Sequence, residues 1–137
     1  PIYSISTLEA IALSHLKTPG TYFSIIPAVG TEVNTAMFSI NNGEINRITD
    51  DFSITQEVLE NKLKQFNEAI YCVGIIPEKI NSFIKSENEV VTFINQSVDG
   101  KVLAQFAYQK LIEGVSGSWK TVFPVYSHMP NLGQKKG

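Results

Sequence analysis

Apolar residues near the start of the chain recur at the three- and four-residue spacing of a helix. Ser6 and Glu9 form a capping box, in which each side chain satisfies a free backbone N–H of the first turn. Pro19-Gly20 stops the pattern, as proline and glycine do at helix ends. The apolar positions of this predicted helix are Leu8, Ile11, Ala12 and Leu16.

Strand patterns follow. Residues 21–30 form a short apolar run, and Pro27 places its far end at a sheet edge, because proline cannot donate a ladder hydrogen bond. Residues 35–48 alternate between apolar and polar positions around Asn42-Gly43, a pair that supplies the positive φ angles of a tight turn. We therefore expect a β-hairpin that turns at Asn42-Gly43.

A second capping box, Ser-Ile-Thr-Gln at residues 53–56, opens the strongest helical pattern of the chain. Its single apolar stripe predicts a core helix over residues 54 to about 69. The stripe consists of Ile54, Val58, Leu59, Leu63, Phe66 and Ile70.

The second half of the chain alternates between strand and helix patterns. Residues 70–77 are typical of a buried strand, Pro77 suits the first position of a short helix, and residues 89–94 predict another strand. A last strand is expected at residues 118–127.

The segment after residue 100 fits two interpretations. Apolar alternation from Val102 to Tyr108 suits a strand, with Asp99-Gly100 as a hairpin tip. The abundance of good helix formers, with Gly114 as a C-terminal cap, suits a helix. We favour the helix.

These elements predict an α+β fold: a mixed, mainly antiparallel sheet of five or six strands with three or four helices packed mainly on one face. An α/β arrangement of the C-terminal half is the alternative. A length of 137 residues suits one domain. We expect residues 1–128 to form it and residues 129–137 to be a flexible tail.

Charge and composition narrow the function classes. The net charge is −2, and the 11 basic residues are scattered as far as Lys135, so the clustered basic footprint of a nucleic-acid binder is missing. The sequence shows no signal-peptide pattern and no apolar run as long as a membrane span. We expect a cytoplasmic protein with neither a nucleic-acid nor a membrane partner, and its lysine-, isoleucine- and asparagine-rich composition suggests a phage or low-GC bacterial origin.

Cysteine and histidine offer little chemistry. Cys72 is the one cysteine, so the chain can build neither an internal disulfide nor a thiolate metal site. His15 and His128 have no ligand spacing, and we expect no metal and no cofactor. Cys72 lies within an apolar strand pattern, where a thiol is inert.

The loop at residues 95–101 is a candidate ligand site. On the helix interpretation it joins the end of a strand to a helix N-terminus, where free N–H groups and the helix dipole favour a small anionic ligand. Aromatic side chains from the last strand would add contacts, since they are favoured at binding surfaces. The residues of this candidate site are Ser97, Gly100, Lys101, Trp119 and Tyr126.

Pro1 is a second candidate, because an N-terminal proline is a secondary amine that can act as a base or nucleophile. The stretch PIYSI, followed by a helix and a strand, resembles tautomerases of the 4-oxalocrotonate type. The predicted helix is too short to cross over a parallel strand pair, and only Arg47 could hold a carboxylate substrate. We therefore expect Pro1 not to be catalytic.

No acid, base and nucleophile converge in the sequence, so we expect no catalytic residues. The predicted function is a non-catalytic cytoplasmic binding or accessory protein that acts through a protein interface or a small-ligand pocket. Its partner would be a protein or a small anionic ligand, and proline-marked edge strands suggest a homodimer. The alternative is a small enzyme that uses Pro1 or the loop at residues 95–101.

Overall fold

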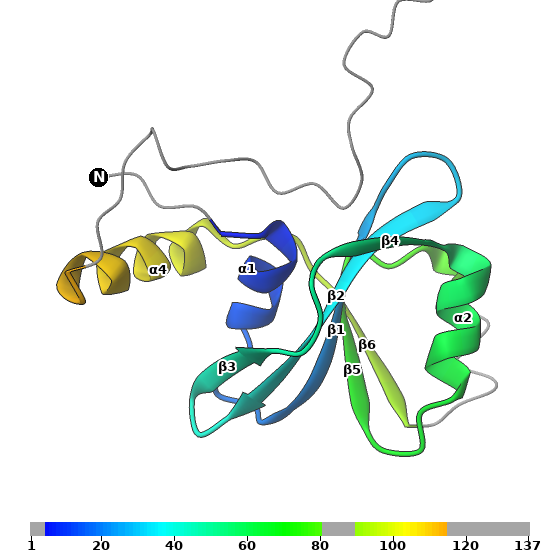
Figure 1. The fold of residues 1–137 in the computed structure, drawn as a ribbon, viewed down its shortest axis with the longest axis horizontal. Coiled ribbons are helices and arrows are strands. Elements are labelled where there is room, and N and C mark those ends of the chain that lie inside the picture. Colours follow the sequence, from blue (N-terminus) through cyan, green and yellow to red (C-terminus); the bar gives the residue numbers. More distant parts are fainter. Residues whose placement is uncertain (1–4, 81–89, 115–137) are drawn as a thin grey trace, which may run out of the picture.

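The computed structural model of the chain describes residues 5–80 and 90–114. Six strands of this part form one sheet in the order β3-β2-β1-β5-β6, and β4 lies beyond the end of β3 on the same side of β2 (Figure 1). Residues 78–80 are also helical. The elements are α1 (Thr7–Leu13), β1 (Gly20–Pro27), β2 (Glu32–Asn41), β3 (Glu44–Arg47), β4 (Phe52–Thr55), α2 (Gln56–Lys64), β5 (Ile70–Gly74), β6 (Val91–Asn95) and α4 (Gly100–Ile112).

The predicted α+β fold with a mixed, mainly antiparallel sheet is confirmed. β2 runs antiparallel to β1, β3 and β4, whereas β5 runs parallel to both β1 and β6. Each parallel pair includes at least one strand from the second half of the chain, where strands and helices alternate, because parallel strands need a crossover connection. β1 therefore has an antiparallel neighbour on one side and a parallel neighbour on the other.

Helices cover both faces of the sheet, and the expectation that they pack mainly on one face is wrong. Leu59 and Leu63 of α2 enter one core together with Phe23, while Leu8 and other residues of α1 enter a second core on the opposite face (Figure 1). The physical reason lies in β1, where residues 22–25 are all buried and face the two cores alternately. A continuous buried run requires cover on both faces.

The predicted hairpin is confirmed. Its turn residues Asn42 and Gly43 have φ angles of 53° and 73°. Asn41 pairs with Glu44 directly across the turn. Two positive φ angles define a type I′ turn, whose twist matches that of the flanking strands.

Replacement of Gly43 by valine is expected to lower the free energy of unfolding by roughly 1 kcal/mol or more, because a β-branched side chain resists positive φ. Asn46→Val is the matched control, since this exposed position lies in a strand that tolerates branched residues. Urea denaturation of both variants measures the difference. Equal stability of the two would contradict the turn assignment.

The start of α2 differs from the predicted capping box at residues 53–56. Thr55 is the N-cap, and its side chain accepts a hydrogen bond from the backbone N–H of Val58 at 3.2 Å. Ser53 and Ile54 belong instead to β4, where Ile54 pairs with Val33 of β2. Pairing with β2 takes these backbone groups away from the helix, so α2 covers residues 56–64 rather than 54–69. Leu59 and Leu63 are its buried residues.

A polar network holds the start of α1 against the connection between β3 and β4. The Ser6 hydroxyl donates to Asp51 Oδ2 at 2.7 Å and accepts from the backbone N–H of Leu8 at 3.2 Å. Arg47 reaches the same carboxylate, with Nη1 2.7 Å from Asp51 Oδ1, and lies 3.9 Å from Glu9. Ser6 is thus the helix cap, as predicted, while Glu9 pairs with Arg47.

Candidate functional site

The segment that allowed two interpretations forms a helix. α4 begins at Gly100, and Asp99 is its N-cap, with a carboxylate that accepts from the backbone N–H of Lys101 at 2.9 Å. The loop between β6 and α4 therefore leads into a helix N-terminus, as the favoured interpretation expected.

A shallow hollow of about 630 Å³ lies between this loop and the end of α1. Ser97 and Gly100, two of the predicted site residues, line it, whereas Lys101 does not. Trp119, Tyr126 and Pro1 lie outside the described residues. The hollow is lined by Ser14, His15, Gln96, Ser97, Val98, Asp99 and Gly100.

Gln96 fixes the loop to α1. Its Nε2 donates to Ser14 Oγ at 2.7 Å and to the carbonyl of Ile11 at 3.3 Å, and its Oε1 lies 2.5 Å from His15 Nε2. Sequence reasoning missed these partners because they are more than 80 positions away and carry no local pattern. Within the hollow, Gln96 is thus the shared hydrogen-bond partner of Ser14 and His15.

The electrostatics of the hollow do not favour an anion. The Asp99 carboxylate lies at its lip and occupies one of the N–H groups that an anion would use. A negative charge in the first turn is itself the group that a helix dipole stabilises there.

Three aromatic side chains stack on the α1 side of the sheet. The rings of His15 and Tyr22 are 5.2 Å apart, and those of Tyr22 and Tyr71 are 4.9 Å apart, all near parallel. Burial, and then the neighbouring Tyr71, raise the pKa of Tyr22, whose hydroxyl donates to the carbonyl of Thr18 at 2.7 Å. The stack is a packing element with a neutral tyrosine at neutral pH.

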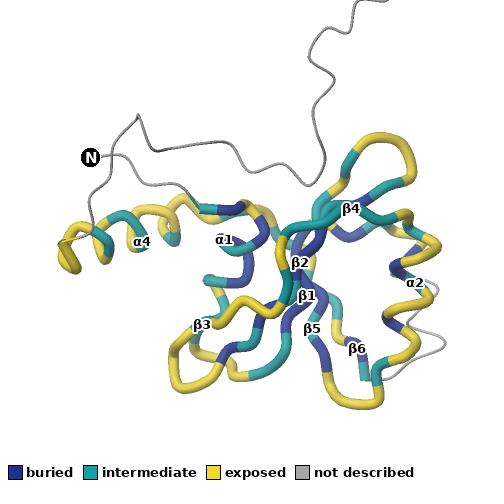
Figure 2. The backbone as a smooth tube through the Cα atoms, in the orientation of Figure 1, coloured by how far each residue is buried: buried dark blue, intermediate teal, exposed yellow. Residues whose placement is uncertain are grey.

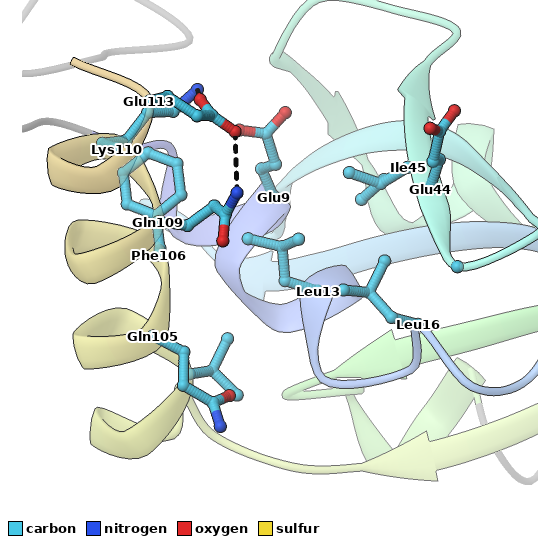
Figure 3. Close-up of a pocket in the computed structure, with 12 residues that line it drawn as sticks. Glu9, Leu13, Leu16, Glu44, Ile45, Gln105, Phe106, Gln109, Lys110 and Glu113 are labelled. Atoms are coloured by element: carbon cyan, nitrogen blue, oxygen red, sulfur yellow. Dashed lines mark hydrogen bonds and ion pairs between the residues drawn. The ribbon is translucent and has the colours of Figure 1, made fainter. Parts of the chain in front are cut away.

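A second, larger concavity of about 730 Å³ lies between α1, α4 and the β2–β3 turn (Figure 3). We call it the α1–α4 groove. Its apolar lining consists of Leu13, Leu16, Ile45, Val102 and Phe106. Its charged lining consists of Glu9, Glu44, Lys110 and Glu113.

Lys110, the one cationic side chain of this lining, already interacts with neighbouring residues of α4. Lys110 Nζ lies 3.7 Å from Glu113 Oε2 and 5.5 Å from the ring centre of Phe106. Gln109 Nε2 donates to Glu113 Oε1 at 3.0 Å. The groove therefore combines an apolar floor with a rim that is acidic on balance.

α4 stands apart from both cores. None of its 13 residues is buried, and its packing partner is chiefly α1. Figure 2 shows exposed and half-buried positions along the whole helix. Its exposed large apolar side chains are Leu103, Tyr108, Leu111 and Ile112, of which the last is 61% exposed.

Catalytic chemistry finds little support in the described residues. Burial raises the pKa of the Cys72 thiol, which stays protonated at neutral pH and is not a nucleophile. In residues 5–80 and 90–114, no three metal-ligating side chains come close enough to hold an ion. In the same residues, no helix is long and apolar enough to cross a bilayer.

Comparison with known proteins shows similarity in fold and does not identify a function. No protein family model matches the chain, and neither does any curated protein. The structure of an uncharacterized protein with similarity to peptidase YeaZ from Pseudomonas aeruginosa superposes with a TM-score of 0.68 at 13% identity, covering 93% of this chain and 59% of that one. A structure of YeaZ from Pseudomonas aeruginosa gives a TM-score of 0.65 at 14% identity, covering 92% of this chain and 59% of that one. At such identities the likeness concerns the fold alone, and the chain matches about three fifths of the length of these neighbours.

Proposed function

We propose that the chain is a non-catalytic cytoplasmic binding protein that acts by protein–protein contact through α4. The observation that carries the proposal is the exposure of large apolar side chains along a helix with no buried residue. Contiguous exposed apolar surface is typical of interaction sites, whereas scattered apolar residues are not. The single buried thiol accords with a reducing compartment.

The binding surface is the side of α4 that faces away from the groove. Leu103, Ala107 and Leu111 recur every four residues and so align on one side of the helix. None of them lines the α1–α4 groove, which Val102 and Phe106 face. We call Leu103, Ala107 and Leu111 the outer stripe.

The partner that fits the outer stripe is a second copy of the chain. A leucine lies four residues before and four residues after Ala107, so the stripe is symmetric about this alanine. Two copies of α4 packed antiparallel around a twofold axis at Ala107 bring each Leu103 against the other copy's Leu111. The small alanine at the centre lets the two helices approach closely.

The other two candidate functions have weaker support. A small anionic ligand in the hollow would face the Asp99 carboxylate. The Cys72 thiol is buried and protonated, so it does not offer an enzyme a nucleophile. No specific observation favours either.

The double substitution Leu103→Lys with Leu111→Lys tests the proposal. Sedimentation equilibrium is expected to give a dimer for the unsubstituted chain and a monomer for the variant, because two charges per helix cannot be desolvated at the interface. The melting temperature at a concentration where both are monomeric is expected to change little, since both leucines are exposed.

Val29→Lys is the matched control. Val29 is 76% exposed at the β1–β2 turn, away from α4, so its replacement removes exposed apolar surface without touching the outer stripe. This variant is expected to remain dimeric. A monomeric unsubstituted chain, or a dimer that survives the double substitution, would contradict the proposal.

A further inference from the structure

We infer that the α1–α4 groove is an intramolecular docking site, occupied by the chain's own residues 118–126 (SWKTVFPVY). This goes beyond the proposed function, because Leu103, Ala107 and Leu111 of the outer stripe do not line the groove. The segment follows α4 in the sequence and lies outside the described residues.

The groove floor is apolar surface without sufficient cover from the described residues. Leu13 of α1, Leu16 of the turn that follows it, Ile45 of β3 and Phe106 of α4 all line it (Figure 3), and each is only half-buried. Half-buried apolar side chains from three separate elements form a concave surface that favours an apolar insert. Trp119 and Phe123 supply large apolar side chains within five residues.

Charge complementarity selects this segment as the occupant. The rim carries Glu9, Glu44 and Glu113, and its one lysine is paired with Glu113. Residues 118–126 contain one lysine, Lys120, and no acidic residue, since all 13 acidic residues of the chain precede them. Opposite charges on the two surfaces favour this pairing over docking of an acidic segment.

The connection permits the docking. Glu113 lines the groove, and the next residue, Gly114, has a φ of 72°, which turns the chain away from the helix axis. Val102 to Glu113 spans about 17 Å along the helix, at about 1.5 Å per residue. An extended segment of about five or six residues has this length at about 3.3 Å per residue. The stretch from Trp119 to Pro124 is therefore long enough to run back along α4.

Trp119 reports on the docking directly, because it is the one tryptophan of the chain. In the full chain its fluorescence emission is expected to be blue-shifted, and acrylamide is expected to quench it several-fold more slowly than in the urea-unfolded chain. Both readings are expected to persist on dilution below the concentration at which copies associate, since the contact lies within one chain. The Leu103→Lys, Leu111→Lys variant is expected to keep both readings, so failure of the dimer and failure of the docking are told apart.

Two groove variants are expected to release Trp119. Phe106→Ser removes part of the floor, and Glu44→Lys reverses a rim charge at an exposed position at the start of β3 with little effect on folding. Both are expected to red-shift the emission and to speed quenching several-fold. Leu111→Ser, at an exposed position of the same helix that does not line the groove, is the matched control and is expected to leave both readings unchanged.

Three outcomes would overturn the inference. The first is a Trp119 as accessible in the folded chain as in the unfolded chain. The second is burial that persists in both groove variants, which would place the tryptophan elsewhere, for example on β6, whose one neighbour among the described strands is β5. The third is burial that disappears on dilution, which would make the occupant a second copy.

Discussion

Gly74→Ala is expected to lower the free energy of unfolding by roughly 2–6 kcal/mol, the sum of backbone strain and overpacking. Gly74 has a φ of +126°, and a Cβ there would overlap the carbonyl oxygen of Ile25 and lie 3.1 Å from its carbonyl carbon. The strands cannot move apart to relieve the overlap. Gly74 pairs with Ile25, and the N–H of Ile75 donates to that same carbonyl at 3.0 Å.

Gly30→Ala is the control for the backbone term alone. Gly30 also has a positive φ, +65°, but a Cβ there meets no atom within 4 Å. Gly30→Ala is expected to lower the free energy of unfolding by about 1–2 kcal/mol, which is what the left-handed conformation costs a residue with a side chain. Urea denaturation measures both variants. If both substitutions lower the free energy of unfolding equally, the close approach of β5 to β1 is not the reason that residue 74 must be glycine.

Leu63→Ala is expected to lower the free energy of unfolding by about 2–5 kcal/mol, the usual range for a buried leucine. Leu63 is fully buried in the core on the α2 side of the sheet, near Phe23 and Ile70. Removal of three side-chain carbons there leaves a cavity between α2 and the sheet, which the β-strands cannot close.

Val58→Ala is the control on the same helix, because Val58 is 43% exposed. Its expected cost is about 0.5 kcal/mol or less, as for most surface positions. Chemical denaturation at two protein concentrations separates folding from association. If Leu63→Ala weakens association and leaves monomer stability intact, α2 is an interface and not a core element.

Features with local causes were predictable from the sequence. The turn at Asn42 and Gly43 follows from the backbone preferences of those two residues. The N-cap at Ser6 and the helix at residues 100–112 follow from capping and helix propensity within a few residues. In each case the neighbours in sequence are also the neighbours in space.

Features with distant causes were not predictable. Ser53 has the sequence of a helix cap, but its strand pairs with β2, and its hydroxyl donates to Asn34 Oδ1 at 2.6 Å. The hollow beside Ser97 depends on His15, which only the folded sheet brings to Gln96. The α1–α4 groove likewise joins residues of three separated segments, and no pattern within any one of them indicates a concave surface.

The position of β1 between two kinds of neighbour sets the order in which the sheet can assemble. Tyr22 pairs with Phe38 across a short hairpin, but with Tyr71 only after β2, β3, β4 and α2 have been placed between them. Closing the longer loop costs more chain entropy, and contacts distant in sequence form more slowly. The antiparallel half is thus expected to fold first and to act as a template, onto which β5 and then β6 add in the slow step.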